Sequence, residues 1–465
     1  MLENFFKLKE NGTTVKTEII AGITTFFAMA YIIFVNPPML SYGDSAVANG
    51  VFFATCISAF VGTILMALLA RLPFAQASGM GLNAFFAYTV MPQMGKLAGI
   101  EDMAPVEQYQ TALAIVFISG LLFIAITILG MREAIVKAIP HNIKIAITGG
   151  IGLFLAFLGL QNAKIVQGNE STLVGLLNFN FAKSDYVTAM GAIITIIGVV
   201  LIAALYARKI KGSILIGMAS CTVLAYVTGV AKLPESISFN FAAQAKDFVD
   251  VSFFHLNFGN LFGSGNILGS ISTILVLIIS FSLVDMFDTI GTLLGTAKRA
   301  NLLDENGEMP RMKQALLCDS IATSAGALLG TSTVTTYVES SAGIGEGGKT
   351  GLTSLTTAIL FLVALVLAPV VGLVPSVATA PALIVVGAMM LSGVKDIDFT
   401  DFSETVPAFL TIAMMPLSYS IANGIAFGLI SYVLIKLICG KIKETHWITW
   451  LLAAFFILRF ALGVY

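Results

Sequence analysis

Apolar stretches long enough to cross a lipid bilayer recur along this chain from one end to the other. A hydrocarbon core about 30 Å thick needs roughly 20 residues of apolar helix, and only helices or closed barrels satisfy the backbone within it. The 465 residues are 57% hydrophobic and 11% charged, whereas a soluble domain carries about 25% charged residues. The sequence therefore predicts an all-α polytopic membrane protein.

Glycine, proline and charged residues divide the apolar sequence into two sets of seven predicted spans. The first set covers about 18–36, 51–70, 80–92, 111–131, 142–160, 186–206 and 212–230. The second covers about 266–297, 313–330, 331–348, 350–372, 376–393, 405–419 and 421–439. We therefore expect a first repeat, 1–230, an extracellular connection, 231–265, and a second repeat, 266–465. The last apolar stretch, 447–463, is either a further pass or an interfacial helix.

Lys and Arg residues set the expected orientation, because the cytoplasmic loops of membrane proteins are enriched in them. With a cytoplasmic N-terminus, most of these residues fall on cytoplasmic segments, and those outside are Lys96, Lys164, Lys183, Lys232 and Lys246. The Lys and Arg residues fall mainly on the cytoplasmic side only if the segments 80–92 and 331–348 each cross the membrane once. We expect a multi-pass protein of the cell (inner) membrane with its N-terminus in the cytoplasm.

The segments 80–92 and 331–348 are the irregular ones, and each is the third span of its set. Each joins a polar or glycine-rich extended piece, 73–81 or 330–337, to a short helical piece. Irregular backbone is tolerated in a membrane only where it is buried in protein or lines a cavity. Interrupted segments at matching places in two halves indicate an inverted-repeat transporter with a binding site near the membrane midplane.

A second correspondence supports a duplication of the chain. Pro140 precedes the fifth predicted span and Pro375 the twelfth, and Gly152 and Gly387 follow them at the same spacing.

Four acidic residues, Asp285, Asp288, Asp319 and Glu339, lie inside apolar stretches, and no Lys or Arg accompanies them. A centrally placed Asp costs about 3 kcal/mol on insertion scales, so such residues usually mark transport or proton pathways. Asp285 and Asp288 are three residues apart and share a helix face. Since both cannot stay charged and unpaired in low dielectric, one is expected to be protonated or to engage a substrate donor or a cation. The alternative is a polar contact that serves only helix packing.

Glu339 and Asn83 are expected near the starts of the two short helices, where backbone N–H groups stabilise an anion. For each, the alternative is a structural cap or an interhelical hydrogen bond. Asp319 is as consistent with a structural contact to Arg311, Lys313 or a neighbouring helix as with a functional role.

Aromatic residues near the broken segments are mostly expected to serve packing, although a planar ligand could stack on one of them. They are Phe26, Phe27, Phe85, Phe86, Tyr88 and Tyr337. Ring N–H groups of such a ligand would donate to the carboxylates, which favours neutral heterocycles over anions.

Other functional classes find little support in the sequence. The segment 343–350 fits the phosphate-loop pattern GxxxxGK[ST], but no α/β domain surrounds it, and we interpret it as a cytoplasmic turn. The four cysteines lack zinc or redox spacing, and a net charge of −1 without a basic patch gives no sign of nucleic-acid binding. For an intramembrane enzyme, the only catalytic arrangement available in the sequence would be an aspartyl-protease-like pair formed by Asp285 and Asp288. We expect no enzyme, no cofactor and no metal.

Three motifs in order give the chain a family resemblance. They are Gly79-Met-Gly-Leu-Asn83-Ala-Phe-Phe, Val284-Asp285-Met-Phe-Asp288-Thr-Ile-Gly and Thr335-Thr-Tyr-Val-Glu339-Ser-Ser-Ala-Gly. From about residue 3 to past 430, the chain resembles the AzgA-like branch of the nucleobase–cation symporters, which are microbial adenine, guanine and hypoxanthine permeases. The resemblance implies a fold like the uracil permease, with 14 spans in two inverted sevens. A core domain would comprise about 17–131 and 266–372, and a gate domain about 132–230 and 373–440. The third and tenth spans would each contain a short strand and a half-helix.

The resemblance also implies roles for individual residues. Asp288 and Glu339 match carboxylates that contact the base, whereas Asn83 and Asp285 match polar positions needed for transport. The predicted substrate-binding set is Asp288, Glu339, Asn83, Asp285, Phe27, Phe85, Tyr337, Thr336 and Ser340, and the proton-coupling candidates are Asp285 and Asp288. Glu339-Ser340 stands where the uracil permease has Glu-Asn, a departure that suits the purine branch.

The predicted function is proton-coupled uptake of a purine nucleobase across the lipid bilayer, driven by the proton gradient, with movement of the core against the gate. Alternatives are a sulfate-type anion carrier or a uracil or xanthine carrier of the same fold, and sodium in place of the proton. A carboxylate-rich site without cations argues against anions. The fold also implies a homodimer as one form of assembly.

Overall fold

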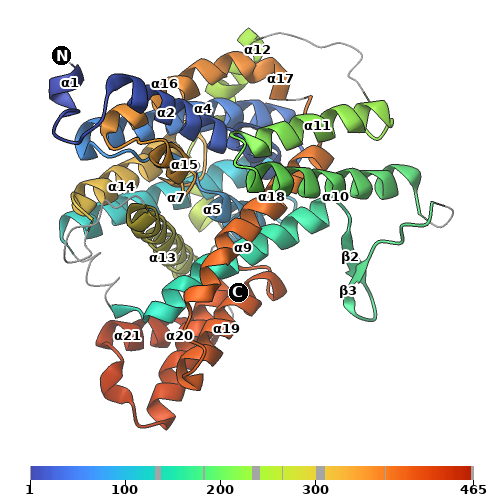
Figure 1. Cartoon of the computed structure of the whole chain (residues 1–465). Helices are drawn as coiled ribbons and strands as arrows, with labels where there is room; N and C mark the ends of the chain where they lie inside the picture. Colours follow the sequence, from blue (N-terminus) through green and yellow to red (C-terminus); the bar gives the residue numbers. More distant parts are fainter. Residues whose placement is uncertain are drawn as a thin grey trace.

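The computed structural model describes residues 2–130, 138–181, 184–232, 241–263, 265, 267–299, 309–371 and 373–461. Over these residues the protein is a bundle of helices with two short two-stranded sheets (Figure 1). Nine helical segments of the described chain, some of them made of consecutive helices, are long and apolar enough to cross a membrane. The predicted polytopic helical class is confirmed, whereas the number of fourteen crossings stays a prediction. The predicted boundary at 131/132, residues 233–240 of the connection, Lys183 and residues 462–463 lie outside the described residues.

The first half of the chain contains eleven described helices and three strands, with the broken third span between α4 and α7. Their bounds are α1 Leu2–Phe5, α2 Val15–Met29, α3 Ile32–Ser41, α4 Ser45–Leu65 with a π-helical turn Met66–Ala70, β1 Gln76–Ser78, α5 Met80–Phe85 with a π-helical turn Phe86–Val90, α6 Met91–Ala98, α7 Pro105–Ile128, α9 His141–Asn162, β2 Val166–Asn169, β3 Leu173–Leu176, α10 Tyr186–Ala207, α11 Ser213–Val227 and α12 Phe241–Asp247.

The second half begins with α13, the longest described helix. Its elements are α13 Ile267–Arg299, α14 Met312–Leu329, β4 Val334–Thr336, α15 Ser340–Gly345, α16 Gly351–Val363, α17 Ala368–Val371, α18 Ser376–Leu391, α19 Phe402–Leu417, α20 Ile421–Ile438 and α21 Trp447–Ala461. At 1.5 Å per residue, a helix of the length of α21 reaches about 22 Å, which is short of a bilayer core of about 30 Å.

Two features differ from the sequence prediction. The first predicted span is two helices, α2 and α3, and α3 runs through Pro37 and Pro38 to Ser41. A hairpin of β2 and β3 lies between α9 and α10, where no strand was expected (Figure 1). Its residues alternate too weakly in hydrophobicity to be distinguished from a loop by sequence.

The two broken spans pair with each other through their strands. β1 and β4 are antiparallel, with Gln76 opposite Thr336 and Ser78 opposite Val334. Beyond the strands, the Gly79 amide donates to the Thr333 carbonyl at 3.0 Å, and the Tyr337 amide donates to the Ala75 carbonyl at 3.0 Å. Backbone groups that would be costly to leave unpaired inside a membrane are thus satisfied by the opposite half. The predicted strand and half-helix in the third and tenth spans are confirmed.

The glycines at matching places in the two halves meet face to face. A Cβ atom at Gly152 would lie 2.5 Å from the Gly387 carbonyl oxygen, and a Cβ at Gly387 would lie 2.3 Å from the Gly152 carbonyl oxygen. Reciprocal contacts of this kind are expected where two related elements pack across a two-fold axis. The duplication inferred from sequence spacing therefore has a structural counterpart in the contact of α9 with α18.

Glu18, at the edge of the first predicted span, is fully buried although the sequence analysis did not count it among the membrane acids. Its carboxylate accepts hydrogen bonds from the backbone amides of Lys349 (2.9 Å), Thr350 (3.2 Å) and Thr353 (3.1 Å). The hydroxyls of Thr350 and Thr353 donate to it as well. The phosphate-loop pattern thus forms a helix start that binds a carboxylate of its own chain.

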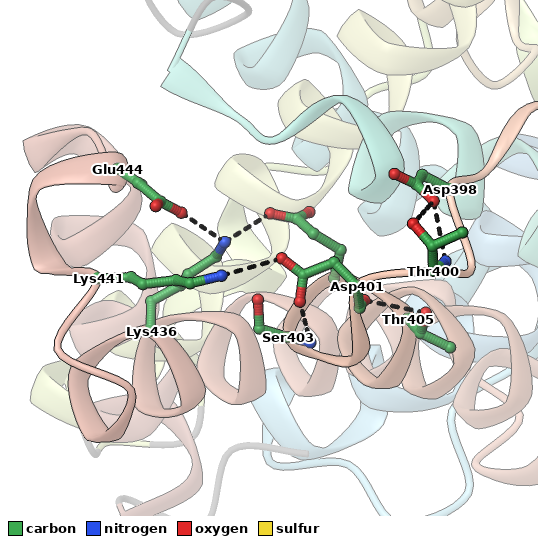
Figure 2. Close-up of polar contacts among 9 residues, drawn as sticks. Asp398, Thr400, Asp401, Ser403, Thr405, Lys436, Lys441 and Glu444 are labelled. Carbon is green, nitrogen blue, oxygen red and sulfur yellow. Dashed lines mark hydrogen bonds and ion pairs between the residues drawn. The ribbon is translucent and has the colours of Figure 1, made fainter.

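A cluster of charges joins α19 to the end of α20 (Figure 2). Lys436, only 2% exposed, forms ion pairs with Glu404 at 2.9 Å and Glu444 at 2.8 Å. Lys441 pairs with Asp401 at 3.1 Å. Because Lys436 lies near the end of an apolar span, the two carboxylates satisfy a cation that would otherwise be costly to bury.

Substituting Gly387 by alanine is expected to push α9 and α18 apart and to destabilise the protein by about 1–3 kcal/mol, the usual cost of overpacking. The measurement is thermal unfolding of the detergent-solubilised protein. Gly168→Ala is the matched control, since nothing lies within 4 Å of a Cβ there. Equal melting temperatures for Gly387→Ala and the wild type would contradict the close approach.

Hydrogen bonding by Ser403 and the Lys441 ammonium hold the pKa of Asp401 at about 2, below its ordinary value of 3.8. A depressed carboxyl pKa contributes stability above the unfolded-state value, and this contribution is lost as pH falls toward the folded value. The wild type is therefore expected to melt higher than Asp401→Asn at pH 7, and the difference is expected to shrink from pH 4 downward. A difference that is independent of pH would refute this role for the Asp401 charge.

Candidate functional site

A cavity of about 990 Å³ lies where the broken spans meet α13 on one side and α9, α10 and α18 on the other. Its walls include Gly79–Gly81 at the start of α5 and Thr335–Glu339 between β4 and α15. At its other end it reaches His141 and Lys144 of α9, Tyr206 of α10 and Asp396 after α18. The cavity is at the upper end of the size range of small-molecule sites.

Glycine makes the narrow part of this site possible. A Cβ atom at Gly79 would lie 2.4 Å from the methyl carbon of Thr335, and one at Gly81 would lie 2.5 Å from a methyl carbon of Ile151 in α9. Without side chains at these positions, the backbone of the first half-helix comes close to the second broken span and to α9.

Two of the predicted acidic residues lie at the cavity. Asp288, partly exposed, and Glu339, only 6% exposed, both line it. The hydroxyl of Tyr31 donates to Oε1 of Glu339 at 2.7 Å, which fixes the orientation of that carboxylate. Tyr31 lies at the break between α2 and α3 and also lines the cavity. Tyr31 was not among the predicted site residues, because one continuous helix was expected there.

The predicted Tyr337 and Thr336 also line the cavity. The Tyr337 hydroxyl donates to the Ser78 carbonyl, and the Thr336 hydroxyl accepts from Nε2 of Gln76 at 3.2 Å. Each thus lines the cavity while a hydrogen bond ties it to the opposite broken span.

Five other predicted site residues do not line the cavity in this structure. Asn83 is buried, and its Oδ1 accepts from Ser78 at 2.8 Å and from Ser332. Asp285 is buried and accepts from Thr323 at 3.1 Å. The Ser340 hydroxyl accepts a hydrogen bond from the Ala75 amide at 3.0 Å. Phe85 packs edge-on against Phe281, with 4.8 Å between the ring centres. Phe27, on α2, is 47% exposed. Direct contact of these five with a substrate stays a prediction.

A second layer of hydrogen bonds lies behind the cavity. The Thr289 hydroxyl is 2.7 Å from Oδ1 of Asp319 and 2.7 Å from the Thr335 hydroxyl. Gln76 donates to Asp319 at 3.5 Å. Arg311, an expected structural partner of Asp319, instead donates to the Ala70 carbonyl at 3.2 Å. Asp319 therefore lies in a hydrogen-bond network with Thr289 and Gln76 that leads to Thr335 at the cavity wall.

The arrangement presents carboxylate and hydroxyl oxygens together with the start of a half-helix to one enclosed space. Such a surface accepts hydrogen bonds from N–H groups of an uncharged ligand. One cation, Lys144 of α9, lies on the same cavity wall near its far end, which the sequence analysis did not expect. Among the described residues, no group of three or more His, Cys, Asp or Glu could hold a metal ion.

Comparison with known proteins gives consistent findings. A family model described as the Permease family matches residues 16–449. The adenine permease AdeP of Escherichia coli (strain K12) is 39% identical over 459 residues, covering 99% of this chain and 96% of that protein. The guanine/hypoxanthine permease PbuO of Bacillus subtilis (strain 168) is 41% identical over 443 residues, covering 95% of this chain and 96% of that protein. A putative permease of Methanocaldococcus jannaschii is 42% identical over 460 residues, covering 99% and 98% of the two chains.

Among solved structures, the transmembrane domain of a cyanobacterium bicarbonate transporter, BicA, matches with a TM-score of 0.61 and 13% identity, covering 88% of this chain and 97% of that one. This likeness confirms the inverted-repeat transporter fold. Together with the relatives that are adenine and guanine/hypoxanthine permeases, the family match confirms the resemblance carried by the three motifs: the chain belongs to the Permease family.

Proposed function

We propose that this protein imports purine nucleobases in symport with protons, with adenine, guanine or hypoxanthine as substrate. The observation that carries the proposal is the meeting of Asp288 and Glu339 at one cavity between two broken spans. A neutral purine has ring N–H donors for these carboxylates and ring nitrogen or carbonyl acceptors for hydroxyls and amides. The names of the similar permeases support the same class of substrate.

We further propose that the base binds between β4–α15 and the start of α5, with Tyr31 holding Glu339 in position. Tyr337 is the predicted aromatic residue that lines the cavity, whereas Phe85 is packed behind it and Phe27 faces outward. We therefore favour Tyr337 over the two phenylalanines as an aromatic contact for the base.

Alternating access would come from movement of a core, about 17–131 and 266–372, against a gate, about 132–230 and 373–440. The cavity lies between these two groups of helices, with α5, α13 and α15 on one side and α9, α10 and α18 on the other. In the predicted orientation, its far end near Lys144 and Asp396 is on the cytoplasmic side. The structure would then correspond to an inward-open state.

Replacing Glu339 by glutamine is expected to weaken purine binding about 10- to 100-fold, since a hydrogen bond to a charged group contributes about 1.5–3 kcal/mol. Binding of hypoxanthine, guanine and adenine to the purified protein measures this. Glu346→Gln is the matched control, because Glu346 is the C-cap residue after α15, is not among the cavity-lining residues, and forms an ion pair with Lys211 at 3.0 Å. Wild-type affinity in Glu339→Gln would exclude Glu339 as a ligand of the base.

Uptake of labelled hypoxanthine, guanine and adenine into cells or proteoliposomes is expected to fall to the level of equilibration when a protonophore collapses the proton gradient. Replacing sodium by potassium at constant pH is expected to leave uptake unchanged. Uptake that ignores the protonophore but requires sodium would assign the coupling to sodium instead of the proton.

A further inference from the structure

Asp319 is fully buried in α14, yet a short chain of hydroxyls connects it to the substrate cavity. The Thr289 hydroxyl of α13 lies 2.7 Å from Oδ1 of Asp319, and the same hydroxyl lies 2.7 Å from that of Thr335 in β4. Thr335 lines the cavity together with Asp288 and Glu339. Two hydroxyl groups thus separate a buried carboxyl group from the place where a purine would bind.

The number of available hydrogen atoms determines which group donates and which accepts in this series of hydrogen bonds. An ionised carboxylate only accepts hydrogen bonds, and a threonine hydroxyl has one hydrogen to donate. When Asp319 is ionised, Thr289 donates to it and must accept from Thr335. The hydrogen of Thr335 is then used inside the protein, and its hydroxyl can only accept from a group in the cavity.

We propose that Asp319 binds the coupling proton and that Thr289 and Thr335 transmit its arrival to the cavity by reversing their hydrogen bonds. This proposal rests on the purine transport proposed above and names a residue outside the predicted coupling pair, Asp285 and Asp288. The proton comes from a hydronium ion in the cavity, which becomes water: Thr335 receives the proton and passes its own to Thr289, which passes its own to Asp319. One proton leaves the cavity, one carboxylate becomes a carboxylic acid, and both hydroxyls remain neutral.

The reversal changes what the cavity can recognise. Protonated Asp319 donates to Thr289, Thr289 donates to Thr335, and Thr335 becomes a donor toward the cavity. A purine needs donors for its ring nitrogen or carbonyl acceptors, whereas Asp288 and Glu339 supply acceptors for its N–H groups. The protonated protein then offers a donor at Thr335 that the ionised protein lacks. Because a buried acceptor without a donor is costly, the base and the proton bind together.

Among the described residues, the titratable neighbours of Asp319 include Cys318 beside it on α14 and Asp288 on α13, which is close enough to interact with it electrostatically. Asp285 lies one turn from Asp288 and is linked to α14 through Thr323. The strands β1 and β4 carry no titratable side chain, α4 carries only Cys56, and α7 has Glu107 and Tyr109 near its start. Arg311, which immediately precedes α14, donates to the Ala70 carbonyl.

The first test uses proton uptake on binding. Hypoxanthine is added to the purified, weakly buffered wild type with a pH indicator dye, and about one proton per bound base is expected to be taken up. Asp319→Asn is expected to bind hypoxanthine with no proton uptake and with an affinity that is the same at pH 6 and pH 8. Its amide NH₂ donates permanently to Thr289, as the carboxylic acid would. In proteoliposomes this variant is expected to exchange hypoxanthine but to lose accumulation driven by a pH gradient.

The second test separates the relay from the carboxyl group itself. Thr289→Val removes the middle hydroxyl and is expected to reduce proton uptake per bound base at least tenfold, while Thr289→Ser retains it. Thr411→Val is the matched control, since this buried hydroxyl of α19 donates to the Pro407 carbonyl of its own helix and is not among the cavity-lining residues. If Asp319→Asn does not fold, the comparison of Thr289→Val with Thr289→Ser still tests the proposal.

Wild-type proton uptake in Asp319→Asn or in Thr289→Val would overturn the proposal and return the coupling to Asp285 or Asp288. Purine binding by the wild type without proton uptake would overturn it as well. A wild type that neither binds nor accumulates any purine would instead refute the proposed function itself.

Discussion

The pairing of β1 with β4 is the interaction on which the rest of this structure depends. Two spans that are not continuous helices leave backbone groups unsatisfied, and in a membrane these groups have no water to bind. Each broken span satisfies the other, through the strand pairs and the bonds from Gly79 to Thr333 and from Tyr337 to Ala75. This brings the starts of both half-helices, from opposite halves of the sequence, to one cavity.

The buried charged groups Glu18 and Lys436 also have their hydrogen-bonding needs met by other parts of the protein. Glu18 is bound by the amides and hydroxyls at the start of α16, and Lys436 lies between two carboxylates. At the cavity, Glu339 accepts from the Tyr31 hydroxyl and from a backbone N–H, and Asp288 is partly exposed. Carboxylates held in place but not fully satisfied are suited to bind a ligand that supplies the missing donors.

Much of the fold could be predicted because its signals are local. The lengths of apolar runs indicate the spans, and glycine-rich interruptions at matching places indicate the broken third and tenth spans. Asp288 and Glu339 stood out because acids are rare within apolar sequence. Tyr31, Thr289 and Thr335 could not be found this way, because a tyrosine or threonine in a membrane helix is ordinary until a distant residue gives it a partner.

The sequence alone determined that this chain is a helical membrane protein with two related halves, two interrupted spans and acidic groups in its second half. Its motifs also indicated the family. Only the tertiary structure decided which of these groups share a space: Asp288 and Glu339 line the cavity, whereas Asn83 and Asp285 lie behind it. The physical reason is that hydrophobicity and helix breaks depend on neighbours in sequence. The orientation of a carboxylate or a hydroxyl depends on hydrogen bonds to residues hundreds of positions away, such as Tyr31 and Glu339.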